Sequence, residues 1–107
     1  MVVSQYSVYL VDLDPTKGSE MRKTRPCVVL SPDEMNQYID TVQVAPLTSN
    51  TRAYPWRCPV HFKNKSGVVA LDHIRSIDKS RITKKSGKLK SSEMVSIKSI
   101  IREMLVD

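Results

Sequence analysis

The polar segment 17–25 concentrates side chains that can bind a phosphate group. It places cations and one carboxylate beside a glycine and a serine, in the run Lys17-Gly-Ser-Glu-Met-Arg-Lys-Thr-Arg25. RNA cleavage without a metal needs a group that takes the 2′ proton, a group that protonates the leaving 5′ oxygen, and positive charge at the phosphate. An arginine suits the last role, because its planar fork matches phosphate oxygens and stays charged. The residue types describe a solvated charged loop equally well.

The two histidines, His61 and His73, are candidates for proton transfer, since imidazole is the usual acid–base group near neutral pH. His61 lies in an alternating apolar and polar segment, where it can simply occupy a solvent-facing position. His73 follows Asp72, and this pair can serve either proton transfer or a surface ion pair. Neither histidine decides the chemistry by itself.

Cys27 and Cys58 have two interpretations. A zinc site would combine them with His61, at Cys-x2-His spacing from Cys58, and with His73. Structural zinc sites use two close-spaced ligand pairs, and this sequence offers one. In a reducing compartment, isolated cysteines are more often small buried hydrophobes. We therefore expect no metal and no other cofactor.

Two aromatic residues, Tyr54 and Trp56, lie in a polar segment between Arg52 and Arg57. Exposed aromatic rings between arginines can stack on unpaired bases. The alternative is that Trp56 turns inward and covers the core.

Composition indicates a small, basic, folded chain. The 107 residues carry 17 Lys and Arg against 11 Asp and Glu, a formal net charge of +6. At 12.1 kDa the chain suits one domain, residues 1–107, and its apolar fraction of 40% is too high for a disordered segment. The charge favours a polyanionic partner such as nucleic acid or an acidic protein. We expect a cytoplasmic protein, because the sequence contains neither an apolar run of membrane-spanning length nor a typical signal peptide.

Short strands and one terminal helix should position these residues. We expect strands over 7–14, 26–31, 40–49, 57–63 and 67–74, a turn at 64–67, and a short helix at 32–38 after the second strand. The basic stretch 79–90 should contain a turn or short helix. Over 91–106, Met94, Ile97, Ile101 and Met104 or Leu105 recur at helical spacing. This pattern predicts a mainly β, small barrel covered by an amphipathic C-terminal helix.

Three blocks of the sequence resemble the MazF/PemK toxin family. The first is Val8-Tyr-Leu-Val-Asp-Leu-Asp-Pro-Thr-Lys-Gly-Ser-Glu20 with Thr24-Arg-Pro-Cys-Val-Val-Leu-Ser31. The second is Val42-Gln-Val-Ala-Pro-Leu-Thr-Ser49. The third runs from Gly67-Val-Val-Ala-Leu-Asp-His-Ile-Arg75 to Lys79 and continues with Arg81-Ile82. The blocks occur in the family's order and extend over nearly the whole chain.

The resemblance implies a toxin of a type II toxin–antitoxin pair. Such a toxin is a sequence-specific, ribosome-independent endoribonuclease that cleaves single-stranded RNA, mainly mRNA. It needs no metal and leaves a 2′,3′-cyclic phosphate and a 5′-OH. The implied fold is an SH3-like β-barrel of the CcdB/MazF type, and the implied partners are a second copy of the chain and an acidic, MazE-like antitoxin in the RNA groove.

The same resemblance implies site residues. Arg25 and Thr48 match the family's catalytic pair, and Glu20 matches an acidic residue that orients the site. Arginine is a poor proton acceptor, so we expect Arg25 chiefly to stabilise the phosphorane, and the group that removes the 2′ proton stays open. The remaining candidates for RNA binding are Lys17, Ser19, Arg22, Lys23, Ser49, Asn50, Arg52, Trp56, Asp72, His73 and Arg75.

The sequence departs from the family pattern at three of its positions. One branch has a catalytic histidine at the position of Ser19 and a catalytic arginine at that of Ala70, which favours the scheme with Arg25 and Thr48 here. His73 stands where glutamine is common. Two alternative functions are a gyrase-poisoning toxin similar to CcdB and a non-catalytic RNA-binding barrel. The first relies on a Trp-Gly-Ile tail, whereas this chain ends Glu103-Met-Leu-Val-Asp107.

Overall fold

The computed structural model describes residues 2–13, 24–50 and 52–106. Within them, seven strands form one curled sheet: β1 (Ser7–Asp12), β2 (Thr24–Val29), β3 (Thr41–Thr48), β4 (Arg57–Phe62), β5 (Lys65–Ala70), β6 (Arg75–Asp78) and β7 (Ile82–Lys88). The helices are α1 (Asp33–Tyr38) and α2 (Ser91–Ile101), with 3₁₀ turns at Leu71–His73 and Lys79–Arg81 and a π-helical turn at Arg102–Val106. Across these ranges, every helix is too short or too polar to cross a membrane.

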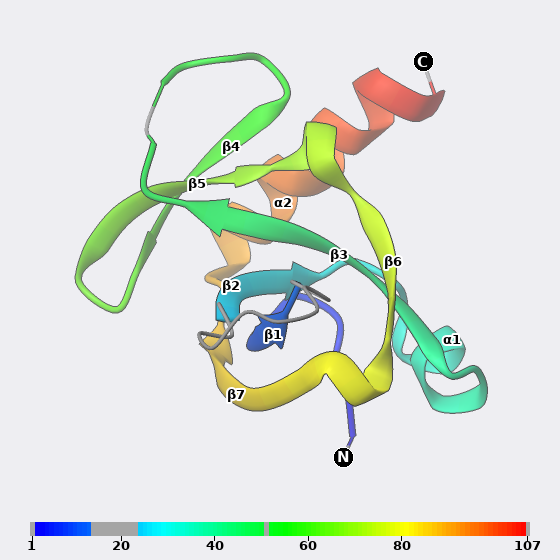
Figure 1. Cartoon of the computed structure of the whole chain (residues 1–107). Helices are drawn as coiled ribbons and strands as arrows, with labels where there is room; N and C mark the ends of the chain where they lie inside the picture. Colours follow the sequence, from blue (N-terminus) through cyan, green and yellow to red (C-terminus); the bar gives the residue numbers. More distant parts are fainter. Residues whose placement is uncertain (1, 14–23, 51, 107) are drawn as a thin grey trace.

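All strand pairs are antiparallel, in the order β4-β5-β3-β2-β1-β7. The long strand β3 lies at the centre of the arrangement. Residues 41–44 of β3 pair with β6, and residues 47–48 pair with β5, so β3 connects two parts of the sheet that bend apart (Figure 1). The result is a half-barrel, with a short helix after the second strand and a C-terminal helix, as the sequence predicted.

Alternate residues of the central strands fill two hydrophobic clusters. Tyr9 and Cys27 belong to one cluster, whereas their chain neighbours Val8 and Val28 belong to the other. Because both faces of the central strands are covered, these strands are rigid supports for residues at their ends. The free cysteines fit this pattern: Cys27 is buried in the first cluster and Cys58 in the second, which confirms their interpretation as small hydrophobes.

The helix α2 packs against β4 through one buried residue and one carboxylate. The side chain of Ile97 is fully buried in the second cluster. Glu93 accepts the backbone N–H of Lys90 at 3.0 Å, which caps the helix, and the backbone N–H of His61 in β4 at 2.7 Å. One side chain thus both starts the helix and attaches it to the sheet.

Several predicted boundaries are wrong. The β4–β5 turn has two residues, Lys63 and Asn64, with φ values of 50° and 63°, as a type I′ hairpin requires, so β5 begins at Lys65. It ends at Ala70, because 71–73 form a 3₁₀ turn rather than more strand.

The C-terminal third differs more from the expectation. The basic stretch 79–90 is mostly strand β7, which pairs with β1 and leaves its lysines exposed. A helix was expected over 91–106, but its α-helical part ends at Ile101. Met104 and Leu105 are exposed rather than packed inward, because the π-helical turn breaks the periodicity on which their prediction rested.

Candidate functional site

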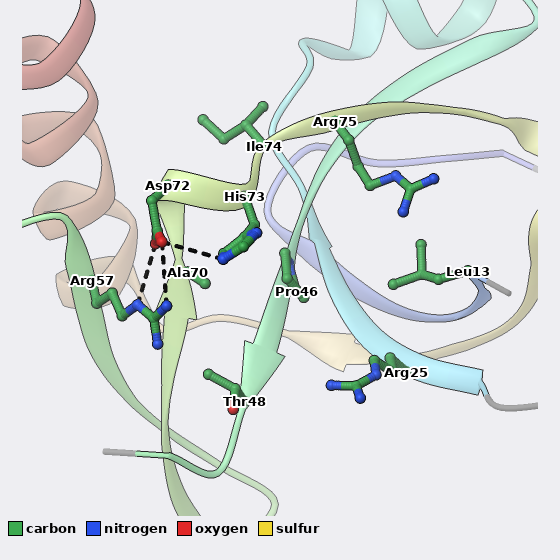
Figure 2. A pocket seen from close by; sticks show the side chains of 10 residues that line it. All are labelled: Leu13, Arg25, Pro46, Thr48, Arg57, Ala70, Asp72, His73, Ile74 and Arg75. Atoms are coloured by element: carbon green, nitrogen blue, oxygen red, sulfur yellow. Dashed lines mark hydrogen bonds and ion pairs between the residues drawn. The ribbon is translucent and has the colours of Figure 1, made fainter. Parts of the chain in front are cut away.

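A cavity of about 600 Å³ opens where β2, β3, β4 and the 3₁₀ turn at 71–73 meet (Figure 2). Its lining combines three arginines, one carboxylate, one histidine and one hydroxyl with an apolar floor. The lining residues are Leu13, Arg25, Pro46, Thr48, Arg57, Ala70, Asp72, His73, Ile74 and Arg75. Five of them, Arg25, Thr48, Asp72, His73 and Arg75, are site residues that the sequence predicted.

Strand register brings Arg25 and Thr48 together. Cys27 of β2 is opposite Pro46 of β3 at the end of their ladder, and Arg25 and Thr48 lie two residues beyond this pair, one on each strand. Both side chains are directed into the same cavity (Figure 2). Two blocks of sequence more than twenty residues apart therefore contribute to one site through the pairing of β2 with β3.

The hydroxyl of Thr48 is oriented by its own chain. Its Oγ1 accepts the backbone N–H of Asn50 at 3.2 Å. Because an acceptor oxygen keeps its own proton, the hydroxyl hydrogen is available for donation to an anion in the cavity. Gly67 of β5 lies so close to this strand that a Cβ atom there would be 2.8 Å from the Thr48 carbonyl oxygen.

Arg57, Asp72 and His73 form a chain of charged contacts at the cavity rim. The Nε and Nη2 atoms of Arg57 donate to the two carboxylate oxygens of Asp72, each at 3.2 Å. The Nε2 atom of His73 lies 3.3 Å from Asp72 Oδ2. Burial by itself would raise the pKa of the Asp72 carboxyl, but hydrogen bonds from Arg57 and its own backbone, with the nearby positive charges, hold that pKa below its usual range.

Charge in the cavity is predominantly positive. The cavity contains one carboxylate, that of Asp72, and three guanidinium groups, those of Arg25, Arg57 and Arg75. The pairing of β6 with β3 fixes the backbone position of Arg75. Beneath the three arginines, burial raises the pKa of the Cys27 thiol to about 11, against the effect of Arg75 and Arg25. The three arginines give the cavity the chemistry of an anion site.

A stacked aromatic pair lies beside the cavity. The rings of Tyr54 and Trp56 are parallel within 10°, with centroids 5.0 Å apart. The guanidinium carbons of Arg52 and Arg57 lie 5.7 Å and 5.4 Å from the Tyr54 centroid. Trp56 is 38% exposed, so the alternative that it covers the core is wrong. Arg57 belongs to both the aromatic stack and the cavity, which makes the two surfaces continuous.

Other predicted residues have different positions. Ser49 lines a separate, more apolar cavity behind Thr48, and Asn50 and Arg52 are exposed on the segment that follows β3. The lysines after Arg81 are exposed on β7 and the segment after it, whereas Lys79 is half-buried on the preceding 3₁₀ turn. Five predictions, including the orienting carboxylate Glu20, lie outside the described residues: Lys17, Ser19, Glu20, Arg22 and Lys23.

Sequence reasoning missed Arg57, although a signal for it exists. The two-residue turn at Lys63 and Asn64 fixes the β4–β5 register, in which Arg57 is opposite Ala70. Asp72 follows two residues later, within reach of the guanidinium. The proposed metal ligands do not gather: among residues 2–13, 24–50 and 52–106, no group of three His, Cys, Asp or Glu side chains could hold an ion.

Comparisons with known proteins identify the family of the chain. A model of the family described as PemK-like, MazF-like toxin of type II toxin–antitoxin system matches residues 4–105. The chain is 34% identical over 102 residues to the endoribonuclease MazF of Staphylococcus epidermidis, covering 90% of this chain and 85% of that protein. It is also 34% identical over 96 residues to the endoribonuclease toxin MazF of Escherichia coli (strain K12), covering 89% and 86%.

The fold is similar to solved structures of the same group. The crystal structure of MazE–MazF (form II) from Deinococcus radiodurans superposes with a TM-score of 0.83 at 27% identity, covering 98% of this chain and 96% of that chain. The overall fold is thus a known arrangement.

Proposed function

This chain belongs to the family of PemK-like, MazF-like toxins of type II toxin–antitoxin systems, and we propose that it is an endoribonuclease. Its substrate is single-stranded RNA, cleaved at specific sequences without a ribosome and without a metal. The observation that carries the proposal is the convergence of Arg25 and Thr48 on one cationic cavity. A cavity with three arginines and one carboxylate suits a phosphodiester, because each backbone phosphate carries a negative charge.

The proposed reaction uses the nucleophile that RNA itself supplies. The 2′-OH attacks the adjacent phosphorus, the bond to the 5′ oxygen breaks, and the products are a 2′,3′-cyclic phosphate and a 5′-OH. Negative charge grows on the non-bridging oxygens in the transition state, and Arg25 stabilises it with a charged, directional donor. The hydroxyl of Thr48 donates to one of the same oxygens, since its own oxygen already accepts from Asn50.

The stacked aromatic pair gives the proposed RNA groove a place for an unpaired base. The exposed Trp56, backed by Tyr54, offers a flat face beside the cavity. Arg52, beside Tyr54, and Arg75, in the cavity, add further positive charge to this surface. Single-stranded substrates fit this arrangement because their bases are free to stack.

The proposed partner is an acidic protein antitoxin that competes with RNA for the positive groove. MazF of Deinococcus radiodurans has been solved with MazE, which supports an antitoxin of that kind for this chain. The net charge of +6 favours both ligands. We further propose that the chain acts in the cytoplasm, where mRNA is found, and that it forms a homodimer.

The test is cleavage of RNA by the purified protein. Total RNA is incubated with the protein and a chelator, and the new ends are mapped and checked for 5′-OH and cyclic phosphate. An oligonucleotide containing the mapped site is then made with a single 2′-deoxy sugar at the scissile position, and it should not be cut. Normal cleavage of that oligonucleotide would refute attack by the 2′-OH.

Two variants assign the cavity in the same assay. Arg25→Ala should lower cleavage by about 10²-fold to 10³-fold, the usual effect of removing one transition-state donor. Lys84→Ala removes one positive charge from exposed β7, outside the cavity, and should leave cleavage near the wild-type rate. Equal losses in both variants would mean that Arg25 acts only through general charge.

A further inference from the structure

Arg57 differs from the other two arginines of the cavity, because among the described residues only Arg57 is paired with a carboxylate. Its Nε and Nη2 atoms donate to the two oxygens of Asp72, each at 3.2 Å, whereas Arg25 and Arg75 have no carboxylate partner in the same part of the chain. The charge of Arg57 is thus compensated before any substrate binds. A phosphate beside Arg57 would also meet the negative charge of Asp72, so Arg25 and Arg75 suit the phosphate better.

The guanidinium of Arg57 is held in place by its neighbours. Asp72 binds one edge of it, and the ring of Tyr54 lies against it, with 5.4 Å between the guanidinium carbon and the ring centroid. Tyr54 is itself stacked on Trp56. The side chain of Arg57 is 15% exposed. A group fixed in this way loses little freedom when it binds a ligand, so Arg57 suits recognition that depends on the direction of hydrogen bonds.

The contact with Asp72 leaves a defined set of donors on Arg57. A guanidinium has five N–H groups, one on Nε and two on each terminal nitrogen. Asp72 accepts the one on Nε and one on Nη2. Because the group is planar, Nη1 points away from the carboxylate, as Figure 2 shows. Across the described residues, Nη1 and the second N–H of Nη2 have no hydrogen-bond partner, and together they form a fork for two neighbouring acceptors.

We propose that Arg57 determines sequence specificity by selecting an RNA base with two adjacent acceptor atoms, and that Asp72 is its positioning residue. This inference rests on the proposed endoribonuclease activity. Guanine offers such a pair in O6 and N7, the most common specific partner of an arginine fork, and cytosine offers another in N3 and O2. On the corresponding edges of adenine and uracil, an N–H donor stands beside each acceptor, so a fork that only donates binds them poorly.

The lining of the cavity fits an unpaired base beside Arg57. Its volume is about 600 Å³, and apolar side chains that can contact the faces of a base are Leu13, Pro46 and Ile74. Single-stranded RNA suits this mode of recognition, because its bases expose the edges that a duplex would pair. The cavity then uses its arginines in two ways: Arg25 and Arg75 bind phosphate, and Arg57 binds a base.

The test is competition among many sequences in one reaction. An RNA library randomised over the mapped site and its flanks is cleaved, and the products are sequenced. The wild type should prefer guanine or cytosine at one position. Arg57→Lys keeps the charge and loses the fork, so this preference should fall by about 10-fold to 10²-fold. Because the preference is a ratio within one reaction, it does not depend on how much of the variant is folded.

Two variants accompany Arg57→Lys. The matched control is Arg75→Lys, which makes the same exchange in the same cavity. Since Arg75 is assigned to phosphate, this variant should lower cleavage of all sequences alike and keep the base preferences. Asp72→Asn removes one of the two acceptors that hold Arg57, so it should weaken the same preference as Arg57→Lys. A purely structural role of Asp72 would lower the rate and leave that preference unchanged, which would overturn its positioning role.

Base analogues distinguish guanine from cytosine and test the contact directly. If guanine is preferred, 7-deazaguanine, which has C–H in place of N7, should slow the wild type about 10-fold and have little effect on Arg57→Lys. If cytosine is preferred, 3-deazacytosine should do the same. A wild type that cleaves the analogue as fast as the natural base would refute the contact.

Failure of the inference and failure of the proposed function look different. If the wild type cleaves RNA but prefers neither guanine nor cytosine at any position, or if Arg57→Lys keeps every preference, the inference fails and the endoribonuclease remains. A uniform loss over all sequences in Arg57→Lys, with a weaker dependence on salt, would place Arg57 at a phosphate and also overturn the inference. If the wild type leaves RNA intact, the proposed function itself fails.

Discussion

Gly67 supports the part of β3 that carries Thr48, and we expect Gly67→Ala to reduce RNA cleavage more than it reduces stability. A Cβ atom at position 67 would lie 2.8 Å from the carbonyl oxygen of Thr48. Ordinary contacts of this kind begin at 3.4 Å, so the strands must separate locally by about 0.6 Å. Because the atom in the way belongs to the backbone, it cannot rotate aside, and Thr48 must move with it.

The size of both effects follows from this displacement. Overpacking costs about 1–3 kcal/mol, and alanine recovers about 0.5–1 kcal/mol over glycine in a strand, so the free energy of unfolding should fall by roughly 0–2.5 kcal/mol. A misplacement of about 1 Å at a reacting group can cost about 10²-fold in rate. For a shift of about 0.6 Å, we expect kcat to fall roughly tenfold or more.

The matched control is Gly87→Ala in β7. Its Cβ would meet the ring of Phe62 at 2.8 Å, which is equally close, but the ring is a side chain that can shift. Urea unfolding should show a smaller loss of stability for Gly87→Ala than for Gly67→Ala. Cleavage of an oligonucleotide containing the mapped site is then measured under single-turnover conditions, well below both unfolding temperatures. The rate should be reduced for Gly67→Ala and should match the wild type for Gly87→Ala. A wild-type kcat for Gly67→Ala would refute the reasoning that the glycine positions Thr48.

Variants at two further positions, Asp72 and Trp56, test the rim of the cavity and the aromatic pair beside it. Because the pKa of Asp72 is lowered in the folded state, its charge stabilises the fold above pH 3.8, and this contribution is lost as pH falls below that value. Urea midpoints should therefore be higher for the wild type than for Asp72→Asn at neutral pH and converge in acid; a constant difference at every pH would contradict the ion pair with Arg57. Trp56→Ala should raise KM for RNA roughly tenfold with kcat little changed, as loss of one base stack predicts, whereas Trp56→Phe should recover most of the affinity. An unchanged KM for Trp56→Ala in steady-state cleavage assays would remove Trp56 from the groove.

The sequence predicted the central strands and the cavity better than it predicted the edges of the fold. The continuous apolar run after Arg25 and the alternating apolar residues before Thr48 both predict strands. These strands are buried because their own side chains are apolar, and these side chains belong to the two hydrophobic clusters. The strand β7 was missed because its lysines are exposed, and its strand geometry comes from pairing with β1, more than seventy residues earlier. Pairing over such a distance leaves little trace in local composition.

The same distinction applies to the site. Arg25 and Thr48 were found through family motifs, and strand register explains why they meet. Arg57 lacks a motif, and its role depends on a hairpin register set by a two-residue turn that was predicted at the wrong residues. The exposure of Met104 and Leu105 was missed because helical periodicity cannot foresee a π-helical turn.

The attachment of α2 to β4 through Glu93 also protects the molecule from aggregation. β4 is the last strand at its end of the sheet path, and an open edge of this kind invites pairing with another chain. Three alternate residues of β4 have no free backbone N–H with which to pair. The N–H of Arg57 donates to the Tyr54 carbonyl, and the N–H of His61 donates to the Glu93 carboxylate. Pro59, between them, has no N–H. The helix cap therefore also blocks edge-to-edge association.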